Sequence, residues 1–247
     1  MNESMHSIAV ILVASGLLFL GRTAYGKLAG FDADHQLTEA DNPAVGTALF
    51  GFLVGILVVI AALLGTDAID AGDANGQLWD LAELLAYGII AIALLKVAGW
   101  CNDRFILHNF ENKKELIDDK NVGAGAVLSG SYIASGLILA GSFSGRLDED
   151  LSNALSSRFE VISQELMVAL ALFVLGQVVL AIYGRIYQWS QPHNVLDAIE
   201  QDYQLNGVTH GGNAAAGLAF GGNLAAVGLV LFGGARHDFE GWVPMLT

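Results

Sequence analysis

The sequence has little charge and almost no cysteine. Asp, Glu, Lys and Arg make up only 15% of its 247 residues, whereas an average soluble domain carries about 25%. A soluble chain so poor in charge would expose much apolar surface to water, which a lipid environment tolerates. The single cysteine, Cys101, excludes an intramolecular disulfide and a cysteine metal cluster.

The sequence also lacks the motifs of catalysis and cofactor binding. It contains no P-loop, no dinucleotide-binding fingerprint and no G-x-S-x-G motif. Its histidines form no H-x-x-H or H-E-x-x-H pair, so we assign no metal site. The net charge of −14 argues against a nucleic-acid partner, because phosphate binding needs a basic surface. We therefore expect no enzymatic activity, no catalytic residue and no cofactor.

Long apolar runs take the place of these motifs. Hydrophobic residues make up 54% of the chain, and its mean hydropathy is +0.53. About 20 apolar residues in a helix cross the hydrocarbon core of a bilayer. Such runs lie at 7–21, 43–65, 81–100, 122–143, 161–184 and 213–234. The sequence therefore predicts an all-α membrane protein with six transmembrane helices, whose first partner is the lipid bilayer.

The flanks of the runs predict the orientation. Arg22 and Lys27 follow the first run and no Lys or Arg precedes it, the reverse of a signal peptide, so we expect a retained span. One side carries Arg22, Lys27, Lys96, Arg104, Lys113, Lys114, Lys120 and Arg185, and the other carries Arg146, Arg158 and Arg236. Because Lys and Arg are enriched in cytoplasmic loops, we expect a bacterial inner-membrane protein with both termini in the periplasm.

The second, fourth and sixth runs share an ungapped pattern. They begin with NPAVGTALFGFLVG at Asn42, NVGAGAVLSGSYIA at Asn121 and NAAAGLAFGGNLAA at Asn213. Counted from the asparagine, positions +4 and +9 are glycine in every copy, and positions +2 and +13 are glycine or alanine. Each copy follows another apolar run and a loop, which predicts three tandem helix-hairpin repeats at 1–66, 67–145 and 146–247.

The pattern predicts helix starts and helix contacts. Asparagine is among the best N-cap residues, so Asn42, Asn121 and Asn213 are predicted N-caps. At about 100° per residue, positions +2, +9 and +13 form one narrow stripe, and stripes of small residues let membrane helices approach closely. The predicted packing residues are Gly46, Gly51, Gly55, Gly125, Gly130, Gly217 and Gly222.

The residues that lead into the first two copies carry a family resemblance. LTEADNPAVG ends at Gly46 and LIDDKNVGAG ends at Gly125. With these segments the chain resembles the YjfL family, a group of uncharacterised bacterial inner-membrane proteins built from a short duplicated domain of unknown function. The third copy departs from the pattern, with THGG before Asn213. The resemblance implies an association with envelope-stress and polyamine-related genes, and no defined chemistry.

Four polar residues are candidates for a solute path. Asn223 lies about 15 Å into the last run, and Gln177 lies within the fifth. Both could line a path, or form hydrogen bonds between helices. Asp80 and Glu165 each lie 19 residues before the glycine near the end of their run. They could attract cations at one level, or mark hydrated helix starts where negative charge suits the helix dipole.

Two loops on the predicted cytoplasmic side could bind a soluble protein or lie on the membrane surface. Loop 101–120 contains Phe105 and Phe110, and loop 186–212 contains the segment 195–205, with apolar residues at helical spacing. The favoured function is an accessory or scaffold protein in envelope maintenance or stress response, which could form a homo-oligomer. The alternative is a channel or transporter for a cation or polyamine, although no span carries the central charge typical of coupled transporters.

Overall fold

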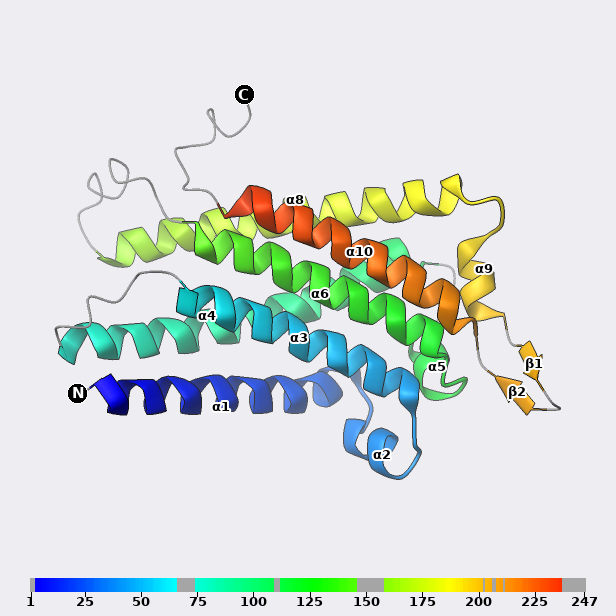
Figure 1. Ribbon diagram of the computed structural model, residues 1–247, viewed down its shortest axis with the longest axis horizontal. Helices are drawn as coiled ribbons and strands as arrows, with labels where there is room; N and C mark the ends of the chain where they lie inside the picture. Colours follow the sequence, from blue (N-terminus) through cyan, green and yellow to red (C-terminus); the bar gives the residue numbers. More distant parts are fainter. Residues whose placement is uncertain are drawn as a thin grey trace.

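The structure is a computed structural model that describes residues 3–65, 74–108, 112–145, 158–201, 203–205, 208–210 and 212–236. Within these residues, six helices are long and apolar enough to cross a membrane (Figure 1). They are α1 (Glu3–Ala29), α3 (Pro43–Gly65), α4 (Ala74–Cys101), α6 (Val122–Ser144), α8 (Arg158–Ser190) and α10 (Ala214–Ala235). The prediction of an all-α membrane protein with six spans is confirmed.

The helices α1, α4 and α8 are longer than their apolar runs. The helix α8, for example, extends from Arg158 to Ser190, whereas the apolar run covers 161–184. Backbone hydrogen bonding within a helix does not depend on apolar side chains, so the helix continues through polar residues beyond the hydrocarbon. By contrast, α3, α6 and α10 match their runs within one residue at each end.

Short elements gather at the end of the molecule where α3, α6 and α10 begin, which we call the asparagine end (Figure 1). They are α2 (Ala33–Thr38), the π-helix η1 (Asn102–Ile106), α5 (Asn112–Ile117), α9 (Val195–Glu200), and the antiparallel strands β1 (Tyr203–Leu205) and β2 (Val208–His210). The helical pattern expected for residues 195–205 is thus only partly correct. The helix ends at Glu200, and the chain then turns into a β-hairpin.

The three glycine-rich helices, α3, α6 and α10, lie side by side in chain order, with α6 between the other two (Figure 1). The helix α4 packs against α1, α3 and α6, while α8 packs against α6 and α10. Every residue from Gly123 to Tyr132 of α6 is buried. This helix therefore occupies the interior of the bundle.

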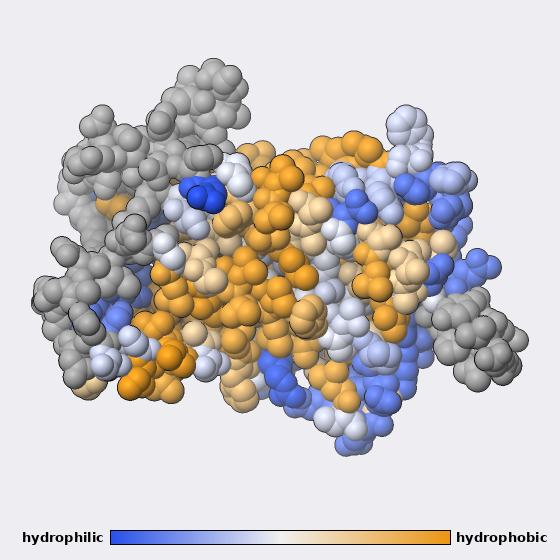
Figure 2. All heavy atoms as spheres, viewed as in Figure 1, coloured by the Kyte–Doolittle hydropathy of each residue, from blue (hydrophilic) through white to orange (hydrophobic). Residues whose placement is uncertain are grey.

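The surface of the bundle is divided by polarity. Figure 2 shows hydrophobic residues across the middle of the molecule and hydrophilic residues around α2, α5 and α9 at the asparagine end. Large apolar side chains on the long helices point outward, among them Phe19, Leu57 and Val230. A surface of this kind suits a lipid environment, in which apolar side chains need no cover.

The glycine helices approach each other backbone to backbone. A Cβ atom at Gly51 would overlap Cα of Ser129, and one at Gly130 would overlap the carbonyl oxygen of Gly221. A Cβ atom at Gly55 would lie 2.8 Å from the carbonyl oxygen of Tyr132. At Gly125 and Gly217 it would overlap the carbonyl oxygens of Ala44 and Gly123. These five predicted glycines lie where two helices touch and where any side chain would force them apart.

Gly222 contacts no other helix within the described residues, in contrast to the prediction for the bundle. This residue is exposed, and a Cβ atom there would meet no atom within 4 Å. Its neighbour Gly221 makes the contact instead, over the carbonyl oxygen of Ala126. Within the described residues, the faces at +2, +9 and +13 of α3 and α6 each pack against the next glycine helix, and the same face of α10 does not. At Gly46, also predicted to pack, a Cβ atom would lie 3.5 Å from the side chain of Leu37 in α2, the one neighbour within 4 Å among the described residues.

Candidate functional site at the asparagine end

The three glycine helices begin in the same way. In each, the side-chain oxygen of the first asparagine accepts a hydrogen bond from backbone N–H groups of the first turn. The pairs are Asn42 with Ala44 and Val45, Asn121 with Ala124, and Asn213 with Ala216. These bonds satisfy N–H groups that a helix start leaves without an intrahelical partner. All three asparagines predicted as N-caps therefore lie at capping positions.

The residue before each asparagine adopts a left-handed backbone conformation. Its φ angle is 46° at Asp41, 48° at Lys120 and 66° at Gly212. This region costs residues other than glycine about 1–2 kcal/mol, yet the sharp turn into each glycine helix requires it. At Gly212 a side chain is also excluded by space, because a Cβ atom would overlap the side chain of Asn121. The turn before α10 thus packs directly against Asn121, the N-cap of α6.

The amide group of Asn42 connects the first copy to the second. Its Nδ2 donates to Oε1 of Gln36 at 2.8 Å and to the carbonyl oxygen of Leu116, in α5, at 2.7 Å. Asn42 is only 2% exposed. Hydrogen bonds shielded from water in this way are expensive to break, because the groups left behind stay buried.

The amide group of Asn121 repeats this arrangement one copy later. Its Nδ2 donates to Oε2 of Glu115 at 2.7 Å and to the carbonyl oxygen of Ile199, in α9, at 2.8 Å. Asn121 is completely buried. By contrast, the third cap, Asn213, is exposed, and its backbone N–H donates to the carbonyl oxygen of Ile199 at 3.1 Å. The first two asparagines therefore both cap a helix and bind the following short helix.

Glu115 is a buried carboxylate within this network. The residue is 3% exposed. Burial raises the pKa of its carboxyl group, and the nearby charges of Asp119 and Glu200 add to this effect. The hydrogen bond from Asn121 and the charge of Lys114 act in the opposite direction. Because the folded state holds this proton more tightly than the unfolded chain, the associated stability is lost as the pH rises through the raised pKa.

Glu115→Gln should keep the bundle stable at neutral pH and reduce the change of its stability with pH above the ordinary range of glutamate. A glutamine oxygen accepts the same bond, as Gln36 does from Asn42, and it carries no charge to bury. Thermal unfolding in detergent at pH 5 and pH 8 measures the effect. The matched control, Gln36→Glu, should introduce a pH dependence at the first copy. A loss of stability in Glu115→Gln at both pH values would contradict this account.

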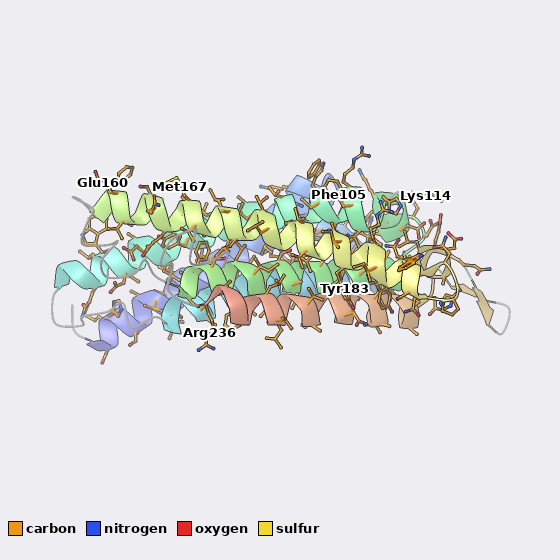
Figure 3. All side chains as sticks on the ribbon, turned by 90° about the horizontal axis from the view of Figure 1, so that it is seen from above. Phe105, Lys114, Glu160, Met167, Tyr183 and Arg236 are labelled. Carbon is orange, nitrogen blue, oxygen red and sulfur yellow. The ribbon has the colours of Figure 1, made fainter. Side chains whose placement is uncertain are left out.

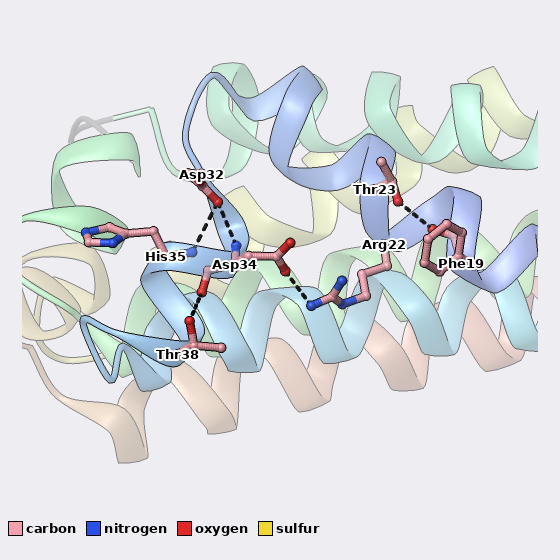
Figure 4. Close-up of polar contacts among 7 residues, drawn as sticks. All are labelled: Phe19, Arg22, Thr23, Asp32, Asp34, His35 and Thr38. Atoms are coloured by element: carbon pink, nitrogen blue, oxygen red, sulfur yellow. Dashed lines mark hydrogen bonds and ion pairs between the residues drawn. The ribbon is translucent and has the colours of Figure 1, made fainter.

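Further polar contacts hold α2 and α5 to their neighbours. Figure 4 shows the ion pair of Arg22 with Asp34 and the capping of α2 by Asp32. Lys113 donates to the carbonyl oxygen of Gly30 at 3.0 Å, and Lys120 donates to that of Ala40. These groups are exposed, so each pair contributes about 1 kcal/mol or less. Their role is to position the short helices against the first copy.

The polar residues within the membrane are bonded to neighbouring helices. Gln177 Nε2 donates to the hydroxyl oxygen of Ser135 at 3.0 Å. The hydroxyl of Tyr183, labelled in Figure 3, donates to Oδ1 of Asn223 at 3.0 Å, and Asn223 Nδ2 donates to the carbonyl oxygen of Ala219 at 2.7 Å. One bond joins α8 to α6 and the other joins α8 to α10. The structure does not bring Gln177 and Asn223 together.

The two acidic residues of the predicted path lie on different helices near the end opposite the asparagines. Glu165 Oε2 accepts a hydrogen bond from the hydroxyl of Tyr87 at 3.4 Å. Asp80 is half-buried on α4, seven residues before Tyr87, or about 10 Å along the helix. Glu165 therefore contacts α4 about two helical turns away from Asp80. Within the described residues, no three His, Cys, Asp or Glu side chains gather as a metal site.

The loops expected to bind a partner use most of their apolar residues internally. In loop 101–120, Ile106, Leu107 and Leu116 are buried in the core of the bundle. In loop 186–212, the buried residues are Val195, Leu196 and Ile199. Phe105 and Trp189 remain exposed, at 45% and 87%, while Phe110 lies outside the described residues. Any partner at this end has these two aromatic side chains to contact.

The sequence reasoning missed Gln36, Glu115 and Ile199. The signal for the first two was present, because Gln36-Leu37 and Glu115-Leu116 lie at the same distance before their asparagines. Extending the ungapped match six residues upstream finds them. Ile199 gives no such signal, because the β-hairpin β1–β2 separates it from Asn213.

The profile of a family described as Domain of Unknown Function (DUF350) matches residues 1–143 and 161–247. The chain belongs to the DUF350 family. The DUF350 match includes all three asparagines, the short helices α2, α5 and α9, and at least nine-tenths of each long helix. No curated protein and no solved structure matches the chain.

Proposed function

We propose that this DUF350 protein is a multi-pass accessory or scaffold protein of the bacterial inner membrane that acts in envelope maintenance or stress response. The family membership is compatible with the resemblance to the YjfL proteins. The supporting observation is the position of α6, which is buried along the interior of the bundle. A path for ions needs a shared lining of polar groups. Here backbone contacts between glycine helices occupy that space instead.

The polar groups at mid-membrane support the same proposal. Gln177 and Asn223 are bonded separately, to Ser135 of α6 and to Tyr183 of α8. Such bonds join helices and are worth about 1 kcal/mol each in membranes. In this proposal they hold the bundle together and do not contact a solute.

The asparagine end is the cytoplasmic face in this proposal, because most Lys and Arg residues gather there. The exposed side chains of Phe105 and Trp189 then lie at the cytoplasmic boundary of the membrane. Aromatic side chains are common both at membrane interfaces and at the centres of protein–protein contacts. We propose that a soluble protein binds the bundle here.

Complementation of a deletion strain tests this proposal. Phe105→Ser combined with Trp189→Ser should remove the cellular function while the protein still folds, because neither side chain is buried. Asn223→Leu should leave the function unchanged, because it only replaces one bond between helices. Membrane abundance and thermal stability in detergent provide the folding control. Full complementation by the aromatic double variant, or loss of function in a well-folded Asn223→Leu protein, would contradict the proposal.

A further inference from the structure

Each glycine helix has two faces that can be defined by counting from its asparagine. The leading face comprises positions +2, +9 and +13, and the trailing face comprises positions +4, +8 and +15. The leading faces are Ala44, Gly51 and Gly55 in α3, Gly123, Gly130 and Ala134 in α6, and Ala215, Gly222 and Ala226 in α10. The trailing faces are Gly46, Phe50 and Leu57 in α3, Gly125, Ser129 and Gly136 in α6, and Gly217, Gly221 and Gly228 in α10.

The leading face of one helix packs on the trailing face of the next, position for position. From α3 to α6 the contacts are Ala44 with Gly125, Gly51 with Ser129, and Gly55 with Gly136. From α6 to α10 they are Gly123 with Gly217, Gly130 with Gly221, and Ala134 with Gly228. In every pair, a Cβ atom added to a glycine would meet a backbone atom of the partner at 2.6 Å or less. The same interface is therefore built twice.

The leading face of α10 has similarly small residues, and no helix among the described residues packs on it. Ala215, Gly222 and Ala226 are exposed, and a Cβ atom at Gly222 would meet no atom within 4 Å. Gly233 continues this stripe by a further seven residues and is equally open. In both preceding copies, the equivalent positions pack against a helix.

At the opposite end of the series, bulky side chains cover the trailing face of α3. The trailing face of α3 carries Phe50 and Leu57, which are 62% and 51% exposed. The corresponding positions of α6 and α10 carry serine or glycine. Large side chains prevent a second chain from placing its α10 against α3 at backbone distance. A head-to-tail array that continues the series from chain to chain therefore cannot form with the same backbone contact.

We propose that the leading face of α10 packs against the leading face of α10 in a second copy of this chain. Two copies inserted in the same orientation are related by a two-fold axis along the membrane normal, which makes their α10 helices parallel. Gly222-x-x-x-Ala226 is the small-x-x-x-small spacing with which parallel membrane helices pair closely. The dimer uses the face of α10 whose counterparts in α3 and α6 each pack against a helix within the chain. It does not depend on the proposed scaffold function.

Cysteine cross-linking in membranes tests the dimer. In a Cys101→Ala background, Ala226→Cys should form a disulfide-linked dimer after mild oxidation, because the two-fold axis places each residue 226 beside its copy. Leu57→Cys, on the bulky trailing face of α3, should stay monomeric. Adding Gly222→Leu to Ala226→Cys should lower the dimer yield about tenfold or more. Gly234→Leu, at another open position of α10, should not.

Gly222→Leu should keep the thermal stability of the monomer, since no atom of the described residues lies within 4 Å of a new Cβ. A loss of cross-linking then reports on the contact between chains. A dimer that forms through residue 226 and weakens with Gly222→Leu supports the proposal. A monomer in native membranes, equal cross-linking of Leu57→Cys, or cross-linking of residue 226 only to a different protein would overturn it.

Discussion

Gly130→Leu should prevent the bundle from folding. Position 130 lies over the carbonyl oxygen of Gly221, within the contact between α6 and α10, and most residues of α6 are buried. A leucine must push the two backbones apart along their whole contact. Overpacking of a core typically costs about 1–3 kcal/mol. We expect at least the upper end of this range, because backbone atoms cannot move aside as the end of a flexible side chain can.

Thermal unfolding in detergent and protein abundance in the membrane measure this effect. Gly234→Leu is the matched control, because it adds the same side chain to α10 where no atom lies within 4 Å of a new Cβ. Gly130→Ala gives an intermediate test, since even a methyl group overlaps Gly221. Equal stability of Gly130→Leu and Gly234→Leu would show that α6 and α10 do not touch at this point.

Asn121→Ala should destabilise the protein far more than Asn213→Ala. Both changes remove an N-cap, which costs about 1 kcal/mol. Only Asn121 also donates from a fully buried amide to Glu115 and to the carbonyl oxygen of Ile199. Leaving a buried acceptor without its donor costs about 1–3 kcal/mol, and more when it is charged. We therefore expect a loss of about 3 kcal/mol or more at Asn121 and about 1 kcal/mol at Asn213.

Replacement by aspartate separates the two roles of the asparagine. Aspartate also caps helices well, so Asn213→Asp should be nearly neutral. In Asn121→Asp the cap survives, but a carboxylate replaces the donor that faces Glu115. The variant should therefore unfold at lower temperature than Asn213→Asp, and most clearly above neutral pH. Equal losses in the two aspartate variants would contradict the idea that Asn121 binds the following short helix.

The sequence predicted the elements of the fold better than their contacts. Six apolar runs and three asparagines could be identified because each is a local signal of length or residue type. Helical periodicity also placed Gly51 and Gly130 at helix contacts. It did not show that the described residues leave Gly222 uncovered, because periodicity shows which residues share a face and not whether a neighbour covers that face.

The network around Glu115 shows a second limit. A glutamate between two lysines and a leucine looks like part of a solvated loop, and only the fold buries it beside the cap of α6. The partner of Asn121, the Ile199 carbonyl, is a backbone group 78 residues away. Any residue type supplies a carbonyl oxygen, so no sequence pattern marks such a contact. The sequence also left the role of Gln177 and Asn223 undecided, because an amide side chain can line a solute path or form a hydrogen bond between helices.

Ion flux through liposomes tests the central claim most directly, which is that packed helices fill the interior of the bundle. Purified, correctly folded protein should pass potassium or a polyamine no faster than protein-free liposomes, at low and at high salt. The contradicting result would be robust flux that Asn223→Leu blocks. A further reduction by Asp80→Asn with Glu165→Gln at low salt, where charge screening is weakest, would then assign these residues to the mouth of a path.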